Sequence, residues 1–278
     1  MIITGGKRMK ENLLVSFSGG RTSAYMAHCL KENFSDKYNL VYVFANTGQE
    51  REETLDFVNK CDKYLSLDLI WVEALVYTER GKGTKYTITD YDSADRSGVN
   101  FEAVIKKYGI PNVNFPHCTR ELKQRPINAY AKKTLGEYTT AIGIRGDEYR
   151  RVKKNQNKFV YPLADWVPVT KQQVNDFWSH QPFNLELEDH QGNCSWCWKK
   201  SFKKLFMLID ETPWVFDFPK KMEALHSSCG PSDTAQVFFR GIRSTDDLFK
   251  YHKEDRRNLF DLGIDDGCSE SCEMYETV

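Results

Sequence analysis

The sequence predicts an α/β fold, a doubly wound and mostly parallel sheet with a smaller, mainly helical, cysteine-bearing region on its C-terminal side. Three short apolar runs carry this prediction, at residues 13–17, 39–45 and 67–72. Each run has the length of a buried strand, and helix-compatible segments follow the first two. Strands that alternate with helices form parallel sheets covered by helices on both faces.

The other elements follow from hydrophobic periodicity and from residues that start or interrupt helices. Residues 77–100 are rich in Gly, Thr, Asp and Tyr, so we expect a loop or a small hairpin that covers a pocket. Pro126 should kink its helix, and Thr170 should cap the helix that follows it. Helices are expected at about residues 24–33, 50–64, 101–108, 118–134 and 170–178, and further strands at 138–143 and 159–162.

The most informative segment joins the first predicted strand to the first predicted helix. Its sequence is Ser18-Gly19-Gly20-Arg21-Thr22-Ser23. Glycines let the backbone approach a phosphate closely, and the unpaired N–H groups and dipole of a helix N-terminus attract anions. The segment predicts a site for a nucleotide or another phosphorylated or sulfated compound, with hydroxyl donors and the Arg21 charge in support. The alternative is an ordinary strand-to-helix turn with a Ser or Thr cap.

A second polar segment follows the predicted strand at 39–45 and contains Asn46, Thr47 and Gly48. Ligands of doubly wound sheets bind beyond the carboxyl ends of the strands, so these residues should face the same crevice. An Asn side chain there can contact a ribose or an adenine edge. A capping box formed by Thr47 and Glu50 is the structural alternative.

A third segment follows the predicted strand at 138–143 and is rich in arginine. Guanidinium groups bind phosphate or sulfate through two parallel hydrogen bonds, which suits a position at the rim of a crevice. A solvated charged loop is the alternative. The arginines concerned are Arg145, Arg150 and Arg151.

The cysteines indicate metal or redox chemistry. Cys194 and Cys197 form a C-x-x-C pair, which suits an iron–sulfur cluster, a zinc ion or a redox dithiol. Candidates for the remaining ligands are Cys118 and, near the C-terminus, Cys268 and Cys272. The lysines after Cys197 either offset the negative charge of such a group or form a solvated helix face. Cys29 and Cys61 lie in helical patterns and should be buried packing residues.

Composition limits the other function classes. Lys and Arg together number 39, as do Asp and Glu, so no overall positive field attracts nucleic acid. No apolar stretch reaches the length of a membrane span, and the N-terminus lacks the apolar core of a signal peptide. We therefore expect a cytoplasmic protein with reduced thiols.

Six segments together resemble the phosphoadenosine phosphosulfate reductase family, which lies within the PP-loop, or adenine nucleotide α-hydrolase, superfamily. They occur in this order between about residues 13 and 205: SFSGGRTSAY, VFANTGQEREET, HCTRELKQRPI, IGIRGDEYRR, VYPLADW and GNCSWCWKKS. Each segment is a weak signal alone, but their order is specific. The resemblance implies a doubly wound fold, adenine nucleotide binding and, in the iron–sulfur branch, a [4Fe–4S] cluster.

The resemblance also implies roles for individual residues. It implies nucleotide binding by Ser18–Ser23 and by Asn46, Thr47 and Gly48. Lys123 matches a lysine in the C-T-x-x-L-K-x-x-P run of the family and should contact phosphate or sulfate. Charge on the transferred group would be stabilised by Lys123, Arg145, Arg150 and Arg151, with Cys272 as candidate nucleophile. The implied cluster ligands are Cys118, Cys194, Cys197 and, from the tail, Cys268.

Three departures from the family pattern bear on the reaction. Thr22 stands where many PP-loop enzymes carry an Asp, which weakens chemistry that relies on that carboxylate. His117 precedes Cys118 where cluster-bearing reductases show two adjacent cysteines. The tail around Cys272 lacks the Glu-Cys-Gly-x-His context of the reductase nucleophile.

The expected architecture is a flexible arm over 1–12, a PP-loop nucleotide-binding domain over 13–165 and a helical region over 166–278. The expected activity is nucleotide-dependent sulfur transfer to DNA, tRNA or a small molecule. One alternative is sulfonucleotide reduction, with release of sulfite and a thiol reductant as partner. Another is a non-catalytic nucleotide-binding protein or a zinc-stabilised nucleic-acid-binding protein. The expected ligands are ATP or an adenylylated sulfonucleotide, with Mg²⁺ as an optional companion, and a [4Fe–4S] cluster or, alternatively, zinc. A homo-oligomer is compatible with all of these.

Overall fold

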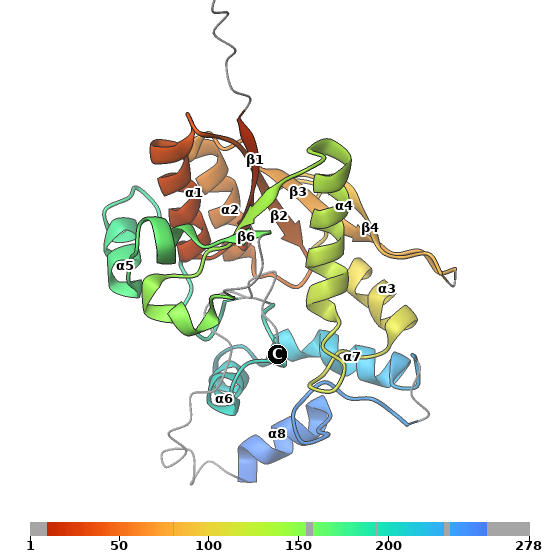
Figure 1. Ribbon diagram of the computed structural model, residues 1–278. Coiled ribbons are helices and arrows are strands. Elements are labelled where there is room, and N and C mark those ends of the chain that lie inside the picture. Colours follow the sequence, from red (N-terminus) through yellow and green to blue (C-terminus); the bar gives the residue numbers. More distant parts are fainter. Residues whose placement is uncertain (1–9, 80, 154–157, 193, 231–233, 255–278) are drawn as a thin grey trace, which may run out of the picture.

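Six strands form a single sheet in the order β4-β3-β2-β1-β5-β6 in a computed structural model of the chain (Figure 1). The structure describes residues 10–79, 81–153, 158–192, 194–230 and 234–254. All neighbouring strands pair in parallel except β4, which runs antiparallel to β3 at one edge. This confirms the predicted doubly wound, mostly parallel sheet. The strands are β1 Glu11–Phe17, β2 Tyr38–Asn46, β3 Ile70–Leu75, β4 Lys85–Thr89, β5 Thr139–Ala141 and β6 Phe159–Val160.

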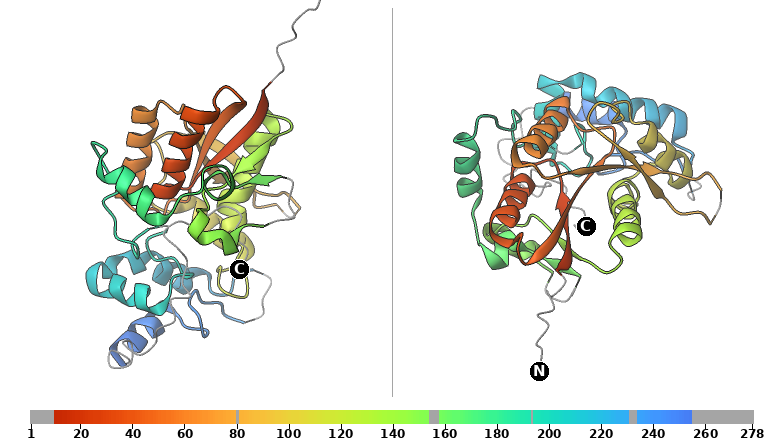
Figure 2. Two further views of the ribbon diagram at one scale, coloured as in Figure 1. Left: turned by 60° about the vertical axis from the view of Figure 1, so that its left-hand side comes forward. Right: turned by 90° about the horizontal axis from the view of Figure 1, so that it is seen from above.

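Helices cover both faces of the sheet and also form a separate layer below its carboxyl edge (Figures 1 and 2). The α-helices are α1 Arg21–Phe34, α2 Glu52–Leu65, α3 Val99–Tyr108, α4 Arg125–Thr134, α5 Lys171–Ser179, α6 Phe202–Glu211, α7 Asp217–His226 and α8 Thr245–Glu254. The shorter turns are the π-helices η1 Arg120–Gln124 and η3 Pro162–Trp166 and the 3₁₀-helices η2 Gly146–Arg151 and η4 Pro213–Phe216.

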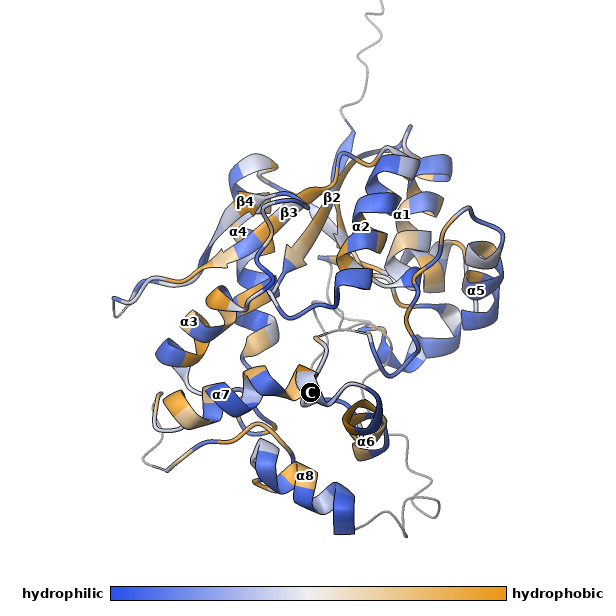
Figure 3. Ribbon diagram, turned by 180° about the vertical axis from the view of Figure 1, so that it is seen from behind, coloured by the Kyte–Doolittle hydropathy of each residue, from blue (hydrophilic) through white to orange (hydrophobic). Residues whose placement is uncertain are grey.

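The alternation of side chains along β1 explains the layering. Leu13, Val15 and Phe17 point into the core under α1 and α2, whereas Leu14 points to the opposite face, against Ile127 of α4. Figure 3 shows the apolar colour of β2 and β3 inside the molecule and polar colour on the outer faces of the helices. Burial on both faces favours the near-continuous apolar runs that marked these strands in the sequence.

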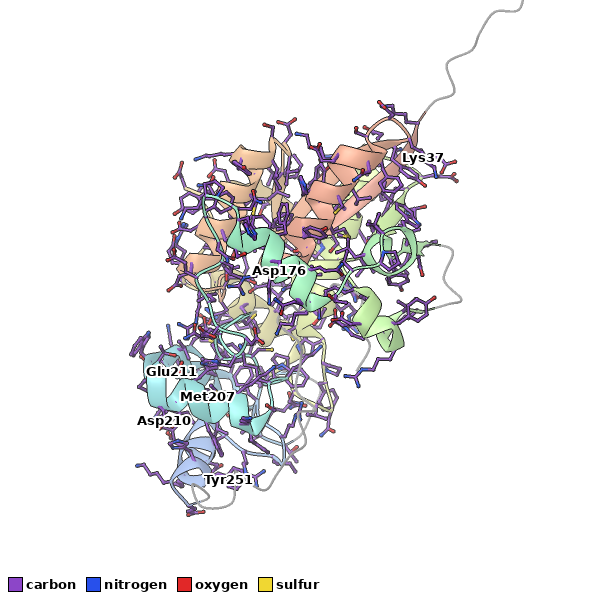
Figure 4. The ribbon with its side chains drawn as sticks, turned by 90° about the vertical axis from the view of Figure 1, so that its left-hand side faces the viewer. Lys37, Asp176, Met207, Asp210, Glu211 and Tyr251 are labelled. Atoms are coloured by element: carbon purple, nitrogen blue, oxygen red, sulfur yellow. The ribbon has the colours of Figure 1, made fainter. Side chains whose placement is uncertain are left out.

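A second hydrophobic core lies in the helical layer and joins α3, α6, α7 and α8. Trp196 is at its centre, with ring centroids 5.5 Å from Phe101, 5.7 Å from Phe218 and 4.8 Å from Phe238. Figure 4 shows α6 in this layer, with Met207, Asp210 and Glu211 labelled along it. Because Ala74 at the end of β3 belongs to the same core, the layer packs directly against the carboxyl edge of the sheet.

Several predicted boundaries move for local reasons. β1 begins at Glu11, so the last residues of the predicted arm pair with β2; residues 1–9 lie outside the described ranges. β3 starts at Ile70 rather than at residue 67, because Ser66 and Asp68 adopt left-handed conformations, with φ of 49° and 53°. The hairpin expected within 77–100 is present as β4. The helix expected at 118–134 contains the π-turn η1 just before Pro126, and the predicted Thr170 cap forms a capping box with Gln173.

Every helix in the described part of the chain is too short or too polar to cross a lipid bilayer.

Candidate functional site

The Ser18–Ser23 loop connects β1 to α1 at the carboxyl edge of the sheet. Gly19 has a φ of +87°, and a Cβ there would lie 2.8 Å from Thr54 Cγ2, so the loop requires glycine at this position. Gly20 is the N-cap of α1, and among the described residues no side chain caps this end of the helix. The first turn of α1 also lacks an acidic residue, so its N–H groups and positive dipole end suit an anion.

Hydrogen bonds inside this loop hold its shape. The Ser23 hydroxyl accepts from the Ser18 N–H at 3.1 Å and lies 3.0 Å from the Ser18 hydroxyl, and it donates to the Gly20 carbonyl at 3.0 Å. The Ser23 side chain is fully buried. The sequence predicted Ser18 and Ser23 as hydroxyl donors to a ligand, whereas the structure places the Ser23 hydroxyl in the closure of the loop.

Arg21 lies in the first turn of α1 but points toward the connection between α5 and α6. Its Nε donates to Asn184 Oδ1 at 2.9 Å, and its Nη2 donates to the Leu185 carbonyl. The Arg21 carbonyl in turn accepts from the Trp178 indole at 2.9 Å. Backbone and amide oxygens thus occupy the guanidinium group of Arg21, and its contact with a phosphate stays a prediction.

The arginine segment reaches the glycine loop through Arg145. The Arg145 Nη1 donates to Thr22 Oγ1 at 3.0 Å, and the guanidinium also pairs with Asp147 at 2.9 Å and Glu148 at 3.4 Å. Arg151 forms an ion pair with Glu148, whereas Arg150 is exposed on η2. The structure therefore brings Arg145 to the predicted phosphate loop and leaves the other two arginines at different places on η2.

Asn46 at the end of β2 takes part in a buried polar network. Its amide donates to Glu73 Oε1 at 2.6 Å and to the Asp95 carbonyl at 2.8 Å, and its Oδ1 accepts from the Gly48 N–H at 3.2 Å. Gly48 has a φ of +74°, and a Cβ there would lie 2.8 Å from the Gly98 nitrogen. The amide of Asn46 thus joins the loop after β2, which contains Gly48, to the loop before α3, which contains Asp95 and Gly98. Its contact with a nucleotide stays a prediction.

Thr47 and Glu50 form half of the predicted capping box. The Glu50 carboxylate accepts from the Thr47 N–H at 2.9 Å and from its hydroxyl at 2.8 Å. The predicted cap position is wrong, however, because α2 begins at Glu52 with Arg51 as its N-cap. The cause is a backbone bridge between Glu50 and Cys194, which keeps this segment extended.

The three cysteines proposed as ligands within the described residues line one cavity of about 30 Å³. Cys118 comes from the segment before η1, and Cys194 and Cys197 come from the loop that precedes α6. Thr47 also lines this cavity, and its hydroxyl lies 3.4 Å from the Cys194 sulfur. We call this space the thiol cavity; its further lining residues are Phe101, Thr119, Lys123, Trp196, Trp198 and Lys199.

The electrostatics of the thiol cavity combine buried charges of both signs. Burial raises the pKa of Cys194 well above its usual range; the nearby Glu50 carboxylate adds to this, and Lys123 opposes it. The Lys123 ammonium lies 3.9 Å from the Glu50 carboxylate, and both side chains are nearly inaccessible to solvent. Without a metal, the cavity therefore favours the neutral thiol at Cys194.

The two lysines that follow the C-x-x-C pair are buried, so the alternative of a solvated helix face is wrong for both. The Lys199 ammonium donates to the Thr119 hydroxyl at 3.4 Å beside the thiols. The Lys200 ammonium donates to the carbonyls of Gly192, Cys194 and Ser195 at 2.7, 2.9 and 3.2 Å. Lys200 therefore fixes the backbone that carries Cys194.

The donor set of the thiol cavity fits a soft, thiolate-bound group, since three sulfurs converge there. Within the described residues, however, no three His, Cys, Asp or Glu side chains are arranged to hold a metal ion. A cavity of about 30 Å³ has room for only a few water molecules, so a four-iron cluster would require the lining side chains to move outward. Cys268 and Cys272, the candidate fourth ligand and nucleophile, lie outside the described residues.

The loop that contains Cys194 and Cys197, which we call the cysteine loop, is hydrogen-bonded to the loop that follows β2. Trp196 Nε1 donates to Gln49 Oε1 at 2.6 Å, and the Ser195 N–H donates to the Gln49 carbonyl at 2.9 Å. Since β1 and β2 pair in parallel, the glycine loop and the 46–50 loop leave the sheet at the same edge. The lining of the thiol cavity includes Thr47 but no residue of the Ser18–Ser23 loop.

Two residues of this region, Glu73 and Glu50, were not predicted as members of the site. Glu73 carried a signal, as the single charged residue in the apolar strand Ile70–Leu75. Glu50 was visible only as part of a cap. For Lys199 and Lys200 the sequence left two roles open, a charge beside the thiols or a solvated helix face, because burial of a lysine depends on tertiary packing.

Comparison with known proteins places the chain in a family. The family model described as "Phosphoadenosine phosphosulfate reductase domain" matches residues 12–181. An uncharacterized nin region protein, ORF290, of Escherichia phage lambda is 33% identical over 94% of this chain and 94% of its own length. An uncharacterized protein of Methanocaldococcus jannaschii is 26% identical over 59% of this chain and 34% of its own length.

A phosphoadenylyl-sulfate (PAPS) reductase from Candida auris, solved as a phosphate complex, is a structural match with a TM-score of 0.37 and 17% identity. The match covers 62% of this chain and 75% of that chain. The family match alone spans more than half of the sequence. The chain therefore belongs to the phosphoadenosine phosphosulfate reductase family.

Proposed function

We propose that this member of the phosphoadenosine phosphosulfate reductase family is an enzyme of adenine-nucleotide-dependent sulfur transfer. The observation that carries the proposal is the convergence of Cys118, Cys194 and Cys197 on one cavity that also includes Thr47, at the edge of the sheet where doubly wound folds bind ligands. A nucleotide site and a sulfur-binding site at the same edge are the two parts that such a reaction needs.

The proposed nucleotide site is the Ser18–Ser23 loop with the N-terminus of α1. Its support is the preformed loop geometry, the uncapped helix end and the Arg145 guanidinium at Thr22. The phosphates of ATP would accept from the N–H groups of the first turn of α1. Arg145 would then exchange part of its pairing with Asp147 and Glu148 for the phosphate.

The proposed sulfur site is the thiol cavity. Cys118, Cys194 and Cys197 would hold a [4Fe–4S] cluster through three thiolates, with the tail residue Cys268 as fourth ligand, or a zinc ion as the alternative. With three cysteine ligands, such a cluster would leave one iron free to bind sulfur; with Cys268 as the fourth ligand, its role would be structural or electrostatic. The buried ammonium groups of Lys123 and Lys199 would offset the negative charge that thiolate ligation brings into the cavity.

The proposed chemistry has two steps. An oxygen of the acceptor attacks the α-phosphorus of ATP, so that the acceptor is adenylylated and pyrophosphate leaves. A sulfur nucleophile at the oxidation level of sulfide then attacks the activated carbon or phosphorus, and AMP leaves. The residues of this chain would hold the phosphates in line and stabilise their developing charge.

The test is a product assay with anaerobically purified protein. We expect ATP to be cleaved to AMP and pyrophosphate in the presence of sulfide and an acceptor, and the Cys194→Ser variant to lose transfer. Cys229→Ser is the matched control, because Cys229 lies three residues after the end of α7 and is not among the residues lining the thiol cavity. ATP that binds without cleavage under all of these conditions would overturn the proposal.

Sulfonucleotide reduction is a second candidate, and membership of the family favours it. In that reaction a thiolate attacks the sulfur of an adenylylated sulfate, and a thiol reductant later releases sulfite. The same assay separates the two reactions, since reduction yields sulfite from the sulfonucleotide and leaves ATP intact.

A further inference from the structure

A second pocket, of about 520 Å³, shares a wall segment with the thiol cavity. His117 and Arg120 line this pocket, whereas Cys118 and Thr119, which lie between them in the sequence, line the thiol cavity. The volume lies in the range of small-molecule sites, roughly 300–1,000 Å³. Any group held in this pocket is therefore separated from the thiols by a single stretch of backbone.

The lining of this pocket combines two cations with two aromatic rings. Lys107 and Arg120 supply the positive charge, and the lining contains no acidic residue. The Lys107 ammonium donates to the carbonyls of Tyr77 and Lys82, which fixes it beside the Tyr108 ring, 5.3 Å from the ring centroid. The lining suits a ligand with a planar ring and a negative charge.

Phe115 provides the exposed aromatic surface of this pocket. The residue is 43% exposed. His117 on the same wall is buried, and its ring centroid lies 5.9 Å from that of the Tyr108 ring. The aromatic groups thus offer a stacking surface, and the charge comes from Lys107 and Arg120.

Positive charge continues from the pocket onto the neighbouring surface. The Arg125 Nη1 lies 3.5 Å from the Tyr108 hydroxyl, and the ammonium groups of Lys82 and Lys85 lie 5.5 and 6.0 Å from the Tyr77 ring. Two carboxylates lie among these cations. Glu121 is fully buried between Arg120 and Arg125, and Glu79 pairs with Lys82. The cations named here and in the pocket therefore outnumber the carboxylates that pair with them.

We propose that this pocket binds one nucleotide unit of a single-stranded nucleic acid. The base stacks on Phe115, its phosphate contacts Arg120 and Lys107, and the adjoining phosphates follow Arg125 and Lys82. A single strand fits better than a duplex, because the bases of a duplex are stacked on each other and cannot enter a pocket. A free mononucleotide would use the pocket but not the basic surface beyond it.

This inference rests on the proposed sulfur transfer for its role, which would be to present a nucleic-acid acceptor next to the thiol cavity. Its test does not depend on that reaction. Strand binding is measured without ATP or sulfide, so it does not require the transfer reaction, whereas ATP cleavage is measured separately in the presence of sulfide and an acceptor. Failure of one assay therefore leaves the result of the other intact.

The test measures binding of a fluorescein-labelled single-stranded DNA of about 15 nucleotides by fluorescence anisotropy, over a series of salt concentrations. We expect Phe115→Ala to weaken binding about tenfold or more, because base stacking on an aromatic side chain is lost. Arg120→Gln should reduce the slope of log K against log salt by about 0.7, the value for one phosphate contact on a single strand. Phe115→Ala should leave that slope unchanged.

Two exposed residues of the helical layer provide matched controls, Trp214→Ala for the aromatic substitution and Lys220→Gln for the charge. Both controls should bind as the wild type does. The proposal is overturned if the wild-type protein does not bind the strand, or if Phe115→Ala and Trp214→Ala have equal effects. It is also overturned if AMP or a duplex of the same sequence binds as tightly as the single strand.

Discussion

The Ser18–Ser23 loop and the thiol cavity lie at the same edge of one sheet but are held together in different ways. The loop is closed by hydrogen bonds of Ser23 to residues at most five positions away. The thiol cavity is assembled from segments around residues 47, 118 and 194, and its backbone is fixed by the buried Lys200 ammonium. The first site depends on local geometry, and the second depends on tertiary packing and buried charge.

This difference predicts how each site responds to substitution. Damage to the loop should lower nucleotide affinity and leave the reactivity of the thiols unchanged. Damage to the cavity should destabilise the helical layer, because Trp196 belongs both to its core and to the contact with Gln49. The two sites should therefore be separable by mutation although they are neighbours.

The largest effect is expected for Lys200→Met. The Lys200 ammonium donates hydrogen bonds to three carbonyls of the cysteine loop. Methionine cannot donate these bonds, so the free energy of unfolding should fall by about 3 kcal/mol. Denaturant unfolding measures the loss, and the rate of thiol modification should rise. The control is Lys203→Met, because Lys203 is exposed at the start of α6. Equal stability of the two variants would show that Lys200 does not hold the loop.

Gly48→Ala should have the next largest effect. The φ of +74° disfavours alanine, and the new Cβ would lie 2.8 Å from the Gly98 backbone nitrogen, so we expect a loss of about 2–3 kcal/mol. Gly136→Ala is the control, since Gly136 has a φ of +70° but no atom within 4 Å of the new Cβ, and should cost only about 1 kcal/mol. Similar thermal unfolding of both variants would contradict the close approach of the two loops.

Ser23→Ala tests the glycine loop alone. The substitution removes the hydroxyl that accepts from the Ser18 N–H inside a buried turn. The ordered loop should therefore be less stable by about 1–2 kcal/mol, and ATP binding should weaken about tenfold. The reactivity of Cys194 should stay at the wild-type value. Calorimetric titration with ATP measures the first effect, and Ser179→Ala on α5 is the control. A change in thiol reactivity without a change in ATP affinity would show that Ser23 supports the thiol cavity and not an ATP site.

Arg145→Lys should have the smallest effect. Lysine keeps the charge but cannot contact Thr22, Asp147 and Glu148 together, so ATP binding should weaken by about threefold to fivefold. Arg150→Lys is the control on the same 3₁₀-helix, where Arg150 is exposed. Equal ATP affinities for both variants would mean that Arg145 serves the fold and not the nucleotide.

Sequence reasoning predicted those parts of the molecule whose interactions are local. The strands β1 and β2 and the helix α1 were predicted because their apolar runs have the lengths of buried elements. The glycine loop was predicted because glycines between a strand and a helix let the backbone approach an anion, and Gly19 does have a positive φ, of 87°. The same reasoning predicted the cap of α5 by Thr170.

The remaining features depend on partners that the sequence does not specify. The Arg21 side chain points away from the phosphate loop because its guanidinium donates to the Leu185 carbonyl. Leu185 lies in a segment that carries no recognisable motif, so the sequence did not predict this contact. Lys200 is buried because the cysteine loop turns its carbonyls inward. The convergence of Cys118 with the C-x-x-C pair was predicted only through the chemistry of thiols and the family resemblance. The sequence left two roles open for the lysines after Cys197, and the burial of Lys199 and Lys200 excludes the solvated helix face for these two.

The most direct test of the account is the metal content of the thiol cavity. Iron, acid-labile sulfide and zinc are counted per chain in anaerobically purified wild-type protein, in the single serine variants of Cys118, Cys194 and Cys197, and in Cys229→Ser. The account predicts a bound group in the wild type and in Cys229→Ser, and its loss in each of the other three variants. A wild-type protein without a bound group, or serine variants that retain it in full, would contradict the account.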